Sequence, residues 1–259
     1  MDAQAVTPNS ASYYTGDKSE YVRSMFADIA HRYDLLNSIL SFNRHYSWRR
    51  KAVRLARLSK GNSALDVCTG TGDFAIELYR AVGPEGKVVG SDFCAPMVAI
   101  GKQKTDITSG GRIQMMVADA QALPYAGSLF DCVTVGFGIR NVADTQRAFN
   151  EMARVAKPGG RVVCLEFNSP RNPLLRSVVR FYEMKILPRI GAMLSKSEAY
   201  TYLPKSIQAF HSREDLVRIM NNAGLTNVSV HELNLGSVCI HIGTKAASSD
   251  TSTIRESGQ

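Results

Sequence analysis

No stretch of the 259-residue sequence approaches the roughly 20 consecutive apolar residues that a membrane-spanning helix requires. The N-terminus, MDAQAVTPNSASYYTG, lacks the apolar segment of a signal peptide and the arginines of a transit peptide. We therefore expect a cytoplasmic protein, for which contact with a membrane from one side stays open.

Cysteine is also scarce, and its spacing excludes several classes of site. The sequence has five cysteines, none of them in a CxxC pair or at the spacing of metal ligands. They are Cys68, Cys94, Cys132, Cys164 and Cys239. Most lie in apolar stretches, which predicts buried free thiols in a reducing compartment. Histidines and carboxylates form no cluster with them, so we expect no metal site.

The composition is that of a folded protein with an excess of positive charge. Hydrophobic residues make up 44% of the chain, and the net charge is +8. Its length suits one domain, which we place at 19–245, between a disordered N-terminus (1–18) and a disordered tail (246–259). Within the domain, 19–60 is predicted to form an N-terminal helical cap and 171–210 a helical insert.

After Gly61 short apolar runs alternate with helical patterns. The runs are SALDVC, KVVGSD, RIQMMVA, FDCVTVGF, RVVCLEF, TNVSVHEL and SVCIHIGTK. Continuous apolar runs separated by helices predict an α/β fold with a doubly wound, mostly parallel sheet covered on both faces. KPGG at 157–160 is expected to separate a helix from the fifth strand. The last two strands are predicted to form a hairpin at the sheet edge, joined near Asn234 to Gly236.

The strongest local motif is LDVCTGTGDFA, which follows a predicted strand and opens a helix. It contains G-x-G-x-x-A as Gly70, Gly72 and Ala75, and glycines let the backbone approach a ligand where a side chain would clash. About 20 residues further on, Asp92 ends the next strand, where a carboxylate can accept hydrogen bonds from a ribose. The glycines could instead only shape a tight turn. The strand, the glycine turn, the helix and the later acid together favour a nucleoside site.

Two carboxylates near this loop favour S-adenosylmethionine over NAD. Asp66 lies in the first strand just before the loop, where it could hold the ammonium group of a methionine moiety. Asp73 opens the following helix, where a dinucleotide would place its pyrophosphate. A carboxylate at this position would repel the negatively charged pyrophosphate. Asp73 could equally serve only the helix dipole.

ADAQALPY supplies a further expected contact. Asp119 and Ala120 follow the third strand, where a side-chain oxygen could accept from the adenine amino group and a backbone N–H could meet a ring nitrogen. The alternative is that Asp119 only caps a turn, which is a common role of aspartate.

With these motifs together the sequence resembles a known family, the ubiquinone/menaquinone biosynthesis C-methyltransferases. The motifs are MFADIAHRYDLLNSILSFNRHYSWRR, LDVCTGTGDF, ADAQALPY, SLFDCVTVGFGIRNVAD, RVAKPGGRVVCLEF and YLPKSIQAF. The resemblance covers Tyr21 to Lys245 and implies a seven-stranded, class I S-adenosylmethionine-dependent methyltransferase fold. It also implies ring methylation of a lipid quinol, either demethylmenaquinol, demethylphylloquinol or a methoxy-benzoquinol precursor of ubiquinone.

The resemblance also implies which residues contact S-adenosylmethionine. In the family the loop threonine, here Thr71, the acid at Asp92 and the pair at Asp119 and Ala120 do so. Family members often have asparagine at the position of Asp119, and either residue can accept from the adenine amino group. A serine is frequent where this chain has Gly136, so only a backbone contact is expected there.

GFGIRN lies beyond the fourth strand, where catalytic groups gather in such folds. Arg140 could stabilise the developing phenolate of the quinol, directly or by positioning a water, and Asn141 could orient a hydroxyl. The alternatives are that Arg140 pairs with a structural acid and that Asn141 caps the next helix. A lid formed by the N-terminal helices could bring Tyr33 or His45 to the substrate as a proton acceptor, with a structural role as the plainer alternative.

Other classes of function are less well supported by the sequence. A nucleic-acid methyltransferase would explain the basic residues between Arg44 and Arg57, but no Asn-Pro-Pro-Tyr-like motif follows the fourth strand. We therefore expect no nucleic-acid partner. A non-catalytic cofactor sensor stays open, and an NAD-dependent oxidoreductase lacks a Tyr-x-x-x-Lys set.

The insert from Arg171 to Leu194 mixes apolar and basic residues and is too short and too charged to span a bilayer. It is predicted to be either an interfacial helix on an anionic membrane or an ordinary core helix in a cap. The motifs do not distinguish naphthoquinol from benzoquinol, and they do not predict an oligomeric state.

Overall fold

The computed structural model describes residues 18–186 and 199–247. The disorder predicted for 1–18 and 246–259 falls outside this description except at Lys18, Ala246 and Ala247, and residues 187–198 of the insert also lie outside it. None of the described helices is long and apolar enough to cross a membrane.

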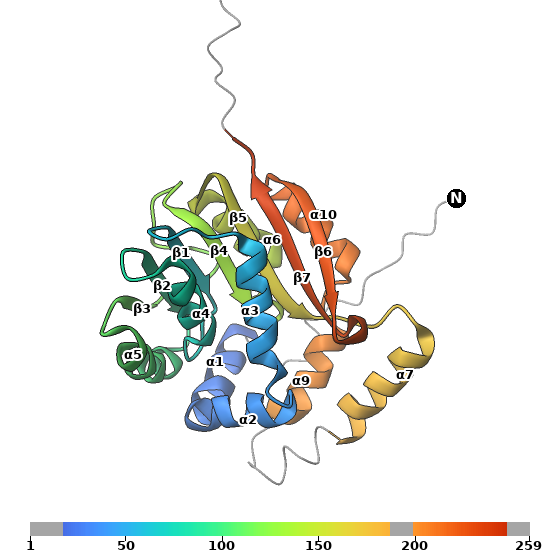
Figure 1. The fold of residues 1–259 in the computed structure, drawn as a ribbon. Helices are drawn as coiled ribbons and strands as arrows, with labels where there is room; N and C mark the ends of the chain where they lie inside the picture. The colour runs from blue at the N-terminus through green and yellow to red at the C-terminus, as the bar shows by residue number, and fades with distance from the viewer. Residues whose placement is uncertain (1–17, 187–198, 248–259) are drawn as a thin grey trace, which may run out of the picture.

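One seven-stranded sheet forms the centre of the molecule, in the order β3-β2-β1-β4-β5-β7-β6 (Figure 1). The strands are β1 (Ser63–Val67), β2 (Lys87–Asp92), β3 (Ile113–Val117), β4 (Phe130–Gly136), β5 (Ala156–Phe167), β6 (Leu225–Leu233) and β7 (Val238–Lys245). β7 is antiparallel to both neighbours, and β1 to β5 pair in parallel. The α/β fold class, the mostly parallel sheet and the final hairpin are therefore confirmed.

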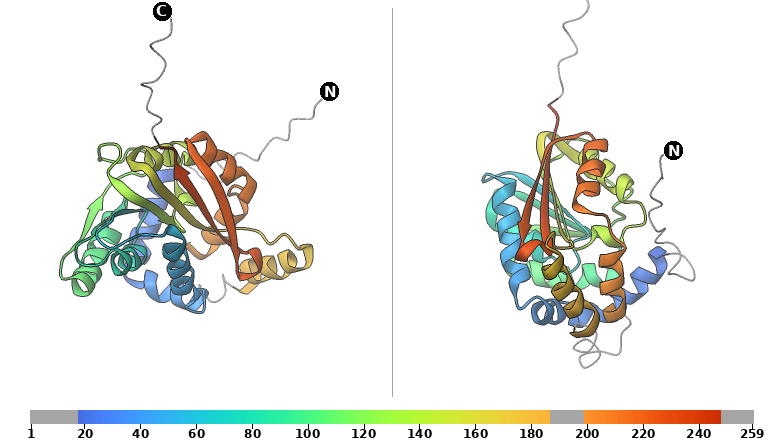
Figure 2. Two further views of the ribbon diagram at one scale, coloured as in Figure 1. Left: turned by 45° about the horizontal axis from the view of Figure 1, so that its top comes forward. Right: turned by 90° about the vertical axis from the view of Figure 1, so that its right-hand side faces the viewer.

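Helices cover both faces of this sheet. α3 (Arg44–Ala56), α4 (Asp73–Val82) and α5 (Ala95–Ser109) pack on one face, and α6 (Thr145–Val155) and α10 (Arg213–Asn222) pack on the other. The right-hand view of Figure 2 shows the blue α3 and the orange α10 on opposite sides of the strands. Because both faces are covered, the central strands are buried, as their continuous apolar runs predict.

A cap lies beyond the carboxyl ends of the parallel strands (Figure 1). It consists of α1 (Lys18–Ile29), the 3-10 turn η2 (Ala30–Arg32), α2 (Tyr33–Leu40), α7 (Pro173–Phe181), the π-helical turn η4 (Tyr182–Ile186) and α9 (Ala199–Gln208). Val22 and Met25 of α1 pack with Tyr202 of α9 and Met97 of α5 in one apolar cluster. This cluster joins both ends of the cap to the sheet domain.

The structure differs from the expected elements in three places. KPGG at 157–160 belongs to β5, which starts directly after α6 and contains an irregularity in its pairing with β4. Of the segment 19–60, expected to form a cap, α3 packs on the sheet instead, after a turn in which Phe42 and Asn43 both have positive φ angles. α7 has no buried residue, so the core-helix alternative is wrong for this helix.

Candidate active site

The first cavity opens at the carboxyl ends of β1, β2, β3 and β4. Its lining residues are Ser19, Phe26, Tyr33, Cys68, Gly70, Asp92, Phe93, Met97, Ala118, Asp119, Ala120, Gln121, Gly136, Phe137, Gly138, Asn141, Val142 and Ala143. β2 and β4 flank β1, so chain connections leave β1 in opposite directions at this point. Open α/β sheets bind their ligands in the crevice that such a reversal creates.

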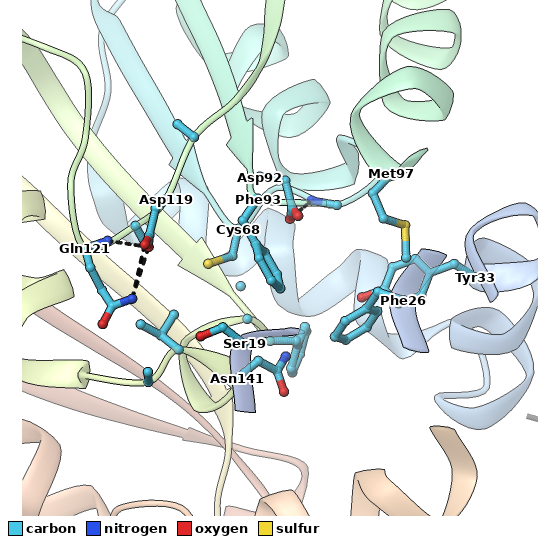
Figure 3. Close-up of a pocket in the computed structure, with 18 residues that line it drawn as sticks. Ser19, Phe26, Tyr33, Cys68, Asp92, Phe93, Met97, Asp119, Gln121 and Asn141 are labelled. Carbon is cyan, nitrogen blue, oxygen red and sulfur yellow. Dashed lines mark hydrogen bonds between the residues drawn. The ribbon is translucent and has the colours of Figure 1, made fainter. Parts of the chain in front are cut away.

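Gly70 of the glycine loop and Asp92 line this cavity, and Figure 3 shows Asp92 beside Cys68 and Phe93. Gly70 and Gly72 have φ angles of 56° and 84°, which glycine adopts without strain. The Asp92 carboxylate accepts from the Gly70 N–H at 2.9 Å and from the Cys94 N–H at 2.9 Å. Burial raises the pKa of Asp92, although these backbone donors lower it in part. The carboxylate thus fixes the loop and remains on the cavity wall.

Asp66 is not where a direct contact with the methionine ammonium requires it. Its side chain does not line the cavity, and it accepts from Thr69 Oγ1 at 2.6 Å and from Thr134 Oγ1 at 2.6 Å. Burial raises the pKa of Asp66 to about 7. The expected contact is therefore replaced by support of the loop from behind.

Thr71 and Asp73 also lie behind the loop instead of on the cavity wall. The Thr71 hydroxyl donates to Asp34 of α2 at 2.5 Å. Lys104 of α5 pairs with Asp34 at 2.7 Å and with Asp73 at 2.5 Å. The cation that Asp73 faces is thus the protein's own lysine, together with Arg49 at 3.6 Å. This network joins the cap to the loop. Asp73 therefore pairs with cations of the protein itself, and its interpretation as part of a ligand site is wrong.

Asp119, Ala120 and Gly136 line the cavity as expected. Asp119 Oδ1 accepts from the Gln121 N–H at 2.9 Å, so the turn-capping alternative is also observed (Figure 3). A Cβ at Gly136 would lie 2.7 Å from Cδ1 of the buried Phe74. A side chain at position 136 would therefore require the Phe74 ring to shift. Gly72 does not line the cavity and precedes α4 as its N-cap.

Sequence reasoning missed the apolar lining of this cavity. Phe93 follows Asp92 directly, Met97 lies one helical turn further on, and Phe26 reaches the cavity from α1. The sequence could have indicated Phe93 and Met97, because both lie within five positions of the acid that ends β2. Phe26 could not be found this way, since only the folded cap brings α1 to the strand ends.

A second, larger cavity adjoins the first, with about 1810 Å³ of free space against about 710 Å³, part of each open to solvent. Phe26, Tyr33 and Phe137 line both cavities and form the boundary between them. Its other apolar lining residues are Met25, Ile29, Leu36, Leu40, Phe42, Trp48, Phe167, Val178, Val179, Tyr182, Tyr202, Leu203 and Ile207. The cap therefore supplies most of an apolar wall beside the glycine-loop cavity.

Arg140 projects from the GFGIRN turn η3 (Ile139–Asn141) into the lining of the second cavity. Its Nη1 pairs with Glu166 Oε1 at 2.8 Å, and its guanidinium lies 5.4 Å from the centre of the Phe167 ring. Both side chains of the ion pair are buried. Burial raises the pKa of Glu166, while Arg140 lowers it in part. Arg140 thus pairs with a structural acid, as one of the two interpretations of the sequence expected. It also lines the second cavity.

Asn141 lines the first cavity, and its side-chain oxygen accepts from the Tyr202 hydroxyl at 2.9 Å. It does not cap the next helix, because Asp144 caps α6 by accepting from the Arg147 N–H. The capping alternative for Asn141 is therefore wrong.

Tyr33 and His45 both line the second cavity, and burial shifts the pKa of each side chain. Burial raises the pKa of Tyr33, so the phenol keeps its proton. Burial lowers the pKa of His45 to about 4, so the imidazole is neutral. Its Nδ1 accepts from the Arg49 guanidinium, which leaves the proton on the other nitrogen, beside Ser38. Both side chains thus carry a proton that they can donate in a hydrogen bond.

Among the described residues, no cluster of His, Cys, Asp or Glu could hold a metal ion. The strand order, the glycine loop and the acid ending β2 define a class I S-adenosylmethionine-dependent methyltransferase. Known structures with this fold include a Thermotoga maritima S-adenosylmethionine-dependent methyltransferase, with a TM-score of 0.60, 18% identity, and coverage of 86% of this chain and 98% of that one. A methyltransferase solved with the Haloferax volcanii Trm112 activator has a TM-score of 0.65 at 18% identity, covering 87% of this chain and 97% of that one.

The chain belongs to the ubiE/COQ5 methyltransferase family, whose model matches residues 14–245. It is 44% identical to the Geobacter sulfurreducens ubiquinone/menaquinone biosynthesis C-methyltransferase UbiE, over 90% of this chain and 91% of that protein. It is 42% identical to the Halalkalibacterium halodurans demethylmenaquinone methyltransferase, over 89% of this chain and 95% of that protein. The resemblance seen in the sequence motifs is thereby confirmed.

Proposed function

We propose that this methyltransferase transfers the methyl group of S-adenosylmethionine to a ring carbon of a lipid quinol, either a demethylmenaquinol, a demethylphylloquinol or a benzoquinol precursor of ubiquinone. The observation that carries the proposal is the second cavity. Its lining is mostly apolar and comes largely from the cap, and three aromatic side chains separate it from the glycine-loop cavity. The names of the two relatives supply the ring chemistry.

The first cavity fits S-adenosylmethionine in its chemistry. Asp92 supplies a carboxylate for a ribose diol, Gly70 a close backbone, and Phe93 and Met97 apolar surface for a purine. Ala120 lies beside them, with its backbone available to a ring nitrogen. When bound, S-adenosylmethionine supplies an electrophilic methyl group on a positively charged sulfur. The aromatic boundary lets that methyl group meet a ring carbon while water is excluded.

Arg140 is the residue that we assign to the developing charge on the quinol. Carbon methylation forms a bond between the methyl group and the ring carbon and breaks the bond between that methyl group and sulfur, whose electron pair stays on the departing S-adenosylhomocysteine. The hydrogen on the ring carbon then leaves as a proton to solvent. The ring is most reactive as a phenolate, whose oxygen a guanidinium stabilises. Glu166 holds Arg140 from behind at 2.8 Å, so the cation is in place before substrate arrives. Tyr33 and His45 are assigned to hydrogen-bond donation to the quinol oxygens.

We also propose that α7 contacts an anionic membrane surface at its cytoplasmic side. α7 exposes Leu174, Val178 and Phe181 at 73%, 59% and 60% of their surface, and Arg176 and Arg180 are exposed between them. Apolar and basic side chains on one short helix suit an interfacial position. Val178 also lines the second cavity, which would let an isoprenoid tail leave beside α7.

Liposome flotation tests this membrane contact. Binding should require anionic lipid, weaken with salt, and fall when Arg176 and Arg180 become serine. The charge-matched control replaces Arg147 and Arg218, which lie on α6 and α10 outside the cap, and should bind like the wild type. Equal binding by the Arg176 and Arg180 variant would place the contact elsewhere.

Methyl transfer from labelled S-adenosylmethionine to a panel of reduced demethylquinols tests the proposed function. The panel should contain naphthoquinols and benzoquinols with tails of several lengths, beside transfer RNA as the rival substrate. We expect label in one or more quinols and none in RNA. Label in RNA alone would reverse the assignment.

A further inference from the structure

The YLP motif near the end of the chain has no role in the function proposed so far. Its tyrosine, Tyr202, lies in α9 and is 5% exposed. The ring packs 6.1 Å from the ring of Tyr21 in α1, within the apolar cluster that holds the cap on the domain. A tyrosine buried in this way places its hydroxyl against a defined partner, because an unsatisfied buried hydroxyl is costly.

The partner is the asparagine of the GFGIRN turn. The Tyr202 hydroxyl donates to Asn141 Oδ1 at 2.9 Å in a buried hydrogen bond. Asn141 is 8% exposed and lines the glycine-loop cavity, while the ring of Tyr202 lines the second cavity. One hydrogen bond therefore joins the two cavities and joins the cap to the turn after β4.

We propose that Tyr202 is a positioning residue that holds the carboxamide of Asn141 with its oxygen toward α9 and its NH₂ group toward the ligand. A carboxamide has nearly the same shape when its oxygen and nitrogen exchange places, so only its hydrogen bonds select one orientation. A tyrosine hydroxyl that donates selects the oxygen. Asn141 lines the glycine-loop cavity, so its donor end serves a quinol oxygen where the quinol ring reaches across the aromatic boundary toward the methyl group, which rests on the function proposed above. It also makes the orientation of Asn141 depend on a closed cap.

The test is Tyr202→Phe, which keeps the buried ring and removes only the hydroxyl. We expect kcat to fall by about 10-fold, the scale of one lost hydrogen bond, with the KM for S-adenosylmethionine within about 2-fold of wild type. The double variant Tyr202→Phe, Asn141→Ala should be no slower than Asn141→Ala alone, because Tyr202 acts through Asn141. Tyr125→Phe is the matched control, since its hydroxyl contacts Met116 outside both cavities.

Unchanged kcat in folded Tyr202→Phe, or additive losses in the double variant, would overturn the proposal. A wild type that methylates no quinol would contradict the proposed function, and the side-chain amide resonances of Asn141 then decide the orientation. They are assigned by their loss in Asn141→Asp. We expect their shifts to change in Tyr202→Phe and not in Tyr125→Phe. Unchanged shifts would overturn the proposal whatever the substrate is.

Discussion

Replacing Arg140 by alanine should reduce turnover far more than cofactor binding. Arg140 lines the second cavity and not the glycine-loop cavity, so its charge acts on the quinol. Removing one such group from a preorganised site lowers kcat by about 10²- to 10³-fold in other enzymes. We expect a loss of that size in kcat and a dissociation constant for S-adenosylmethionine within about 3-fold of wild type. Arg140→Lys should recover only part, because it lacks the planar fork.

Arg140→Ala should also lower the free energy of unfolding, and the size of this loss follows from the buried ion pair with Glu166. Arg140→Ala leaves Glu166 as an unpaired carboxyl with 1% of its side chain exposed. Breaking a buried pair costs about 3–5 kcal/mol when the remaining group stays charged. Burial already raises the pKa of Glu166 and Arg140 lowers it in part, so the variant raises that pKa further. A carboxyl whose pKa is higher in the folded state destabilises the fold as pH rises from its unfolded pKa through its folded pKa.

Urea unfolding at several pH values between 5 and 8 measures this effect. The loss of unfolding free energy in Arg140→Ala, relative to wild type, should be smallest at pH 5 and grow toward pH 8. Arg140→Ala, Glu166→Gln should lose most of this pH dependence, because glutamine carries no charge. A stability loss independent of pH would contradict the ion-pair argument. Unchanged kcat in the folded variant at saturating substrate would remove Arg140 from the proposed chemistry.

Three further changes test the cofactor side of the site. Asp92→Ala should weaken S-adenosylmethionine binding by about 1–3 kcal/mol in calorimetry, the scale of a lost charge-assisted hydrogen bond, and unchanged affinity would exclude the ribose contact. Gly136→Ser should lower the melting temperature, because its Cβ would lie 2.7 Å from Phe74 Cδ1, and an unchanged midpoint would show that Phe74 can move. Lys104→Met should speed release of S-adenosylhomocysteine in stopped-flow experiments, because Lys104 joins Asp34 of the cap to Asp73, and an unchanged rate would mean that cap opening does not pass through this network.

The sheet and the glycine loop could be predicted because their signals are local. The seven apolar runs correspond to the seven strands, and the loop lies between β1 and α4 as its motif predicts. Asp92 could be placed for the same reason, since the end of a parallel strand faces the binding edge. Asp66 could not. Spacing locates it near the loop, but Thr69 and Thr134 hold its carboxylate on the side away from the cavity.

The second cavity could not be predicted, because its walls come from distant parts of the chain. Glu166 reaches Arg140 from β5, and Tyr202 reaches Asn141 across 61 positions of sequence. No periodicity indicates such partners. The proton-acceptor roles expected of Tyr33 and His45 stay predictions for a related reason, since burial and the Arg49 contact shift the pKa values of these side chains only in the folded protein.

The central claim is that the methyl group goes to a ring carbon of a lipid quinol. It is tested most directly by supplying S-adenosylmethionine with a ¹³C-labelled methyl group and a reduced demethylquinol, and recording the carbon spectrum of the product. The account predicts a single labelled methyl resonance at the chemical shift of a methyl group on an aromatic carbon. It also predicts that this signal is nearly lost with Arg140→Ala. A labelled resonance in the methoxy range would show methylation of oxygen and contradict the claim.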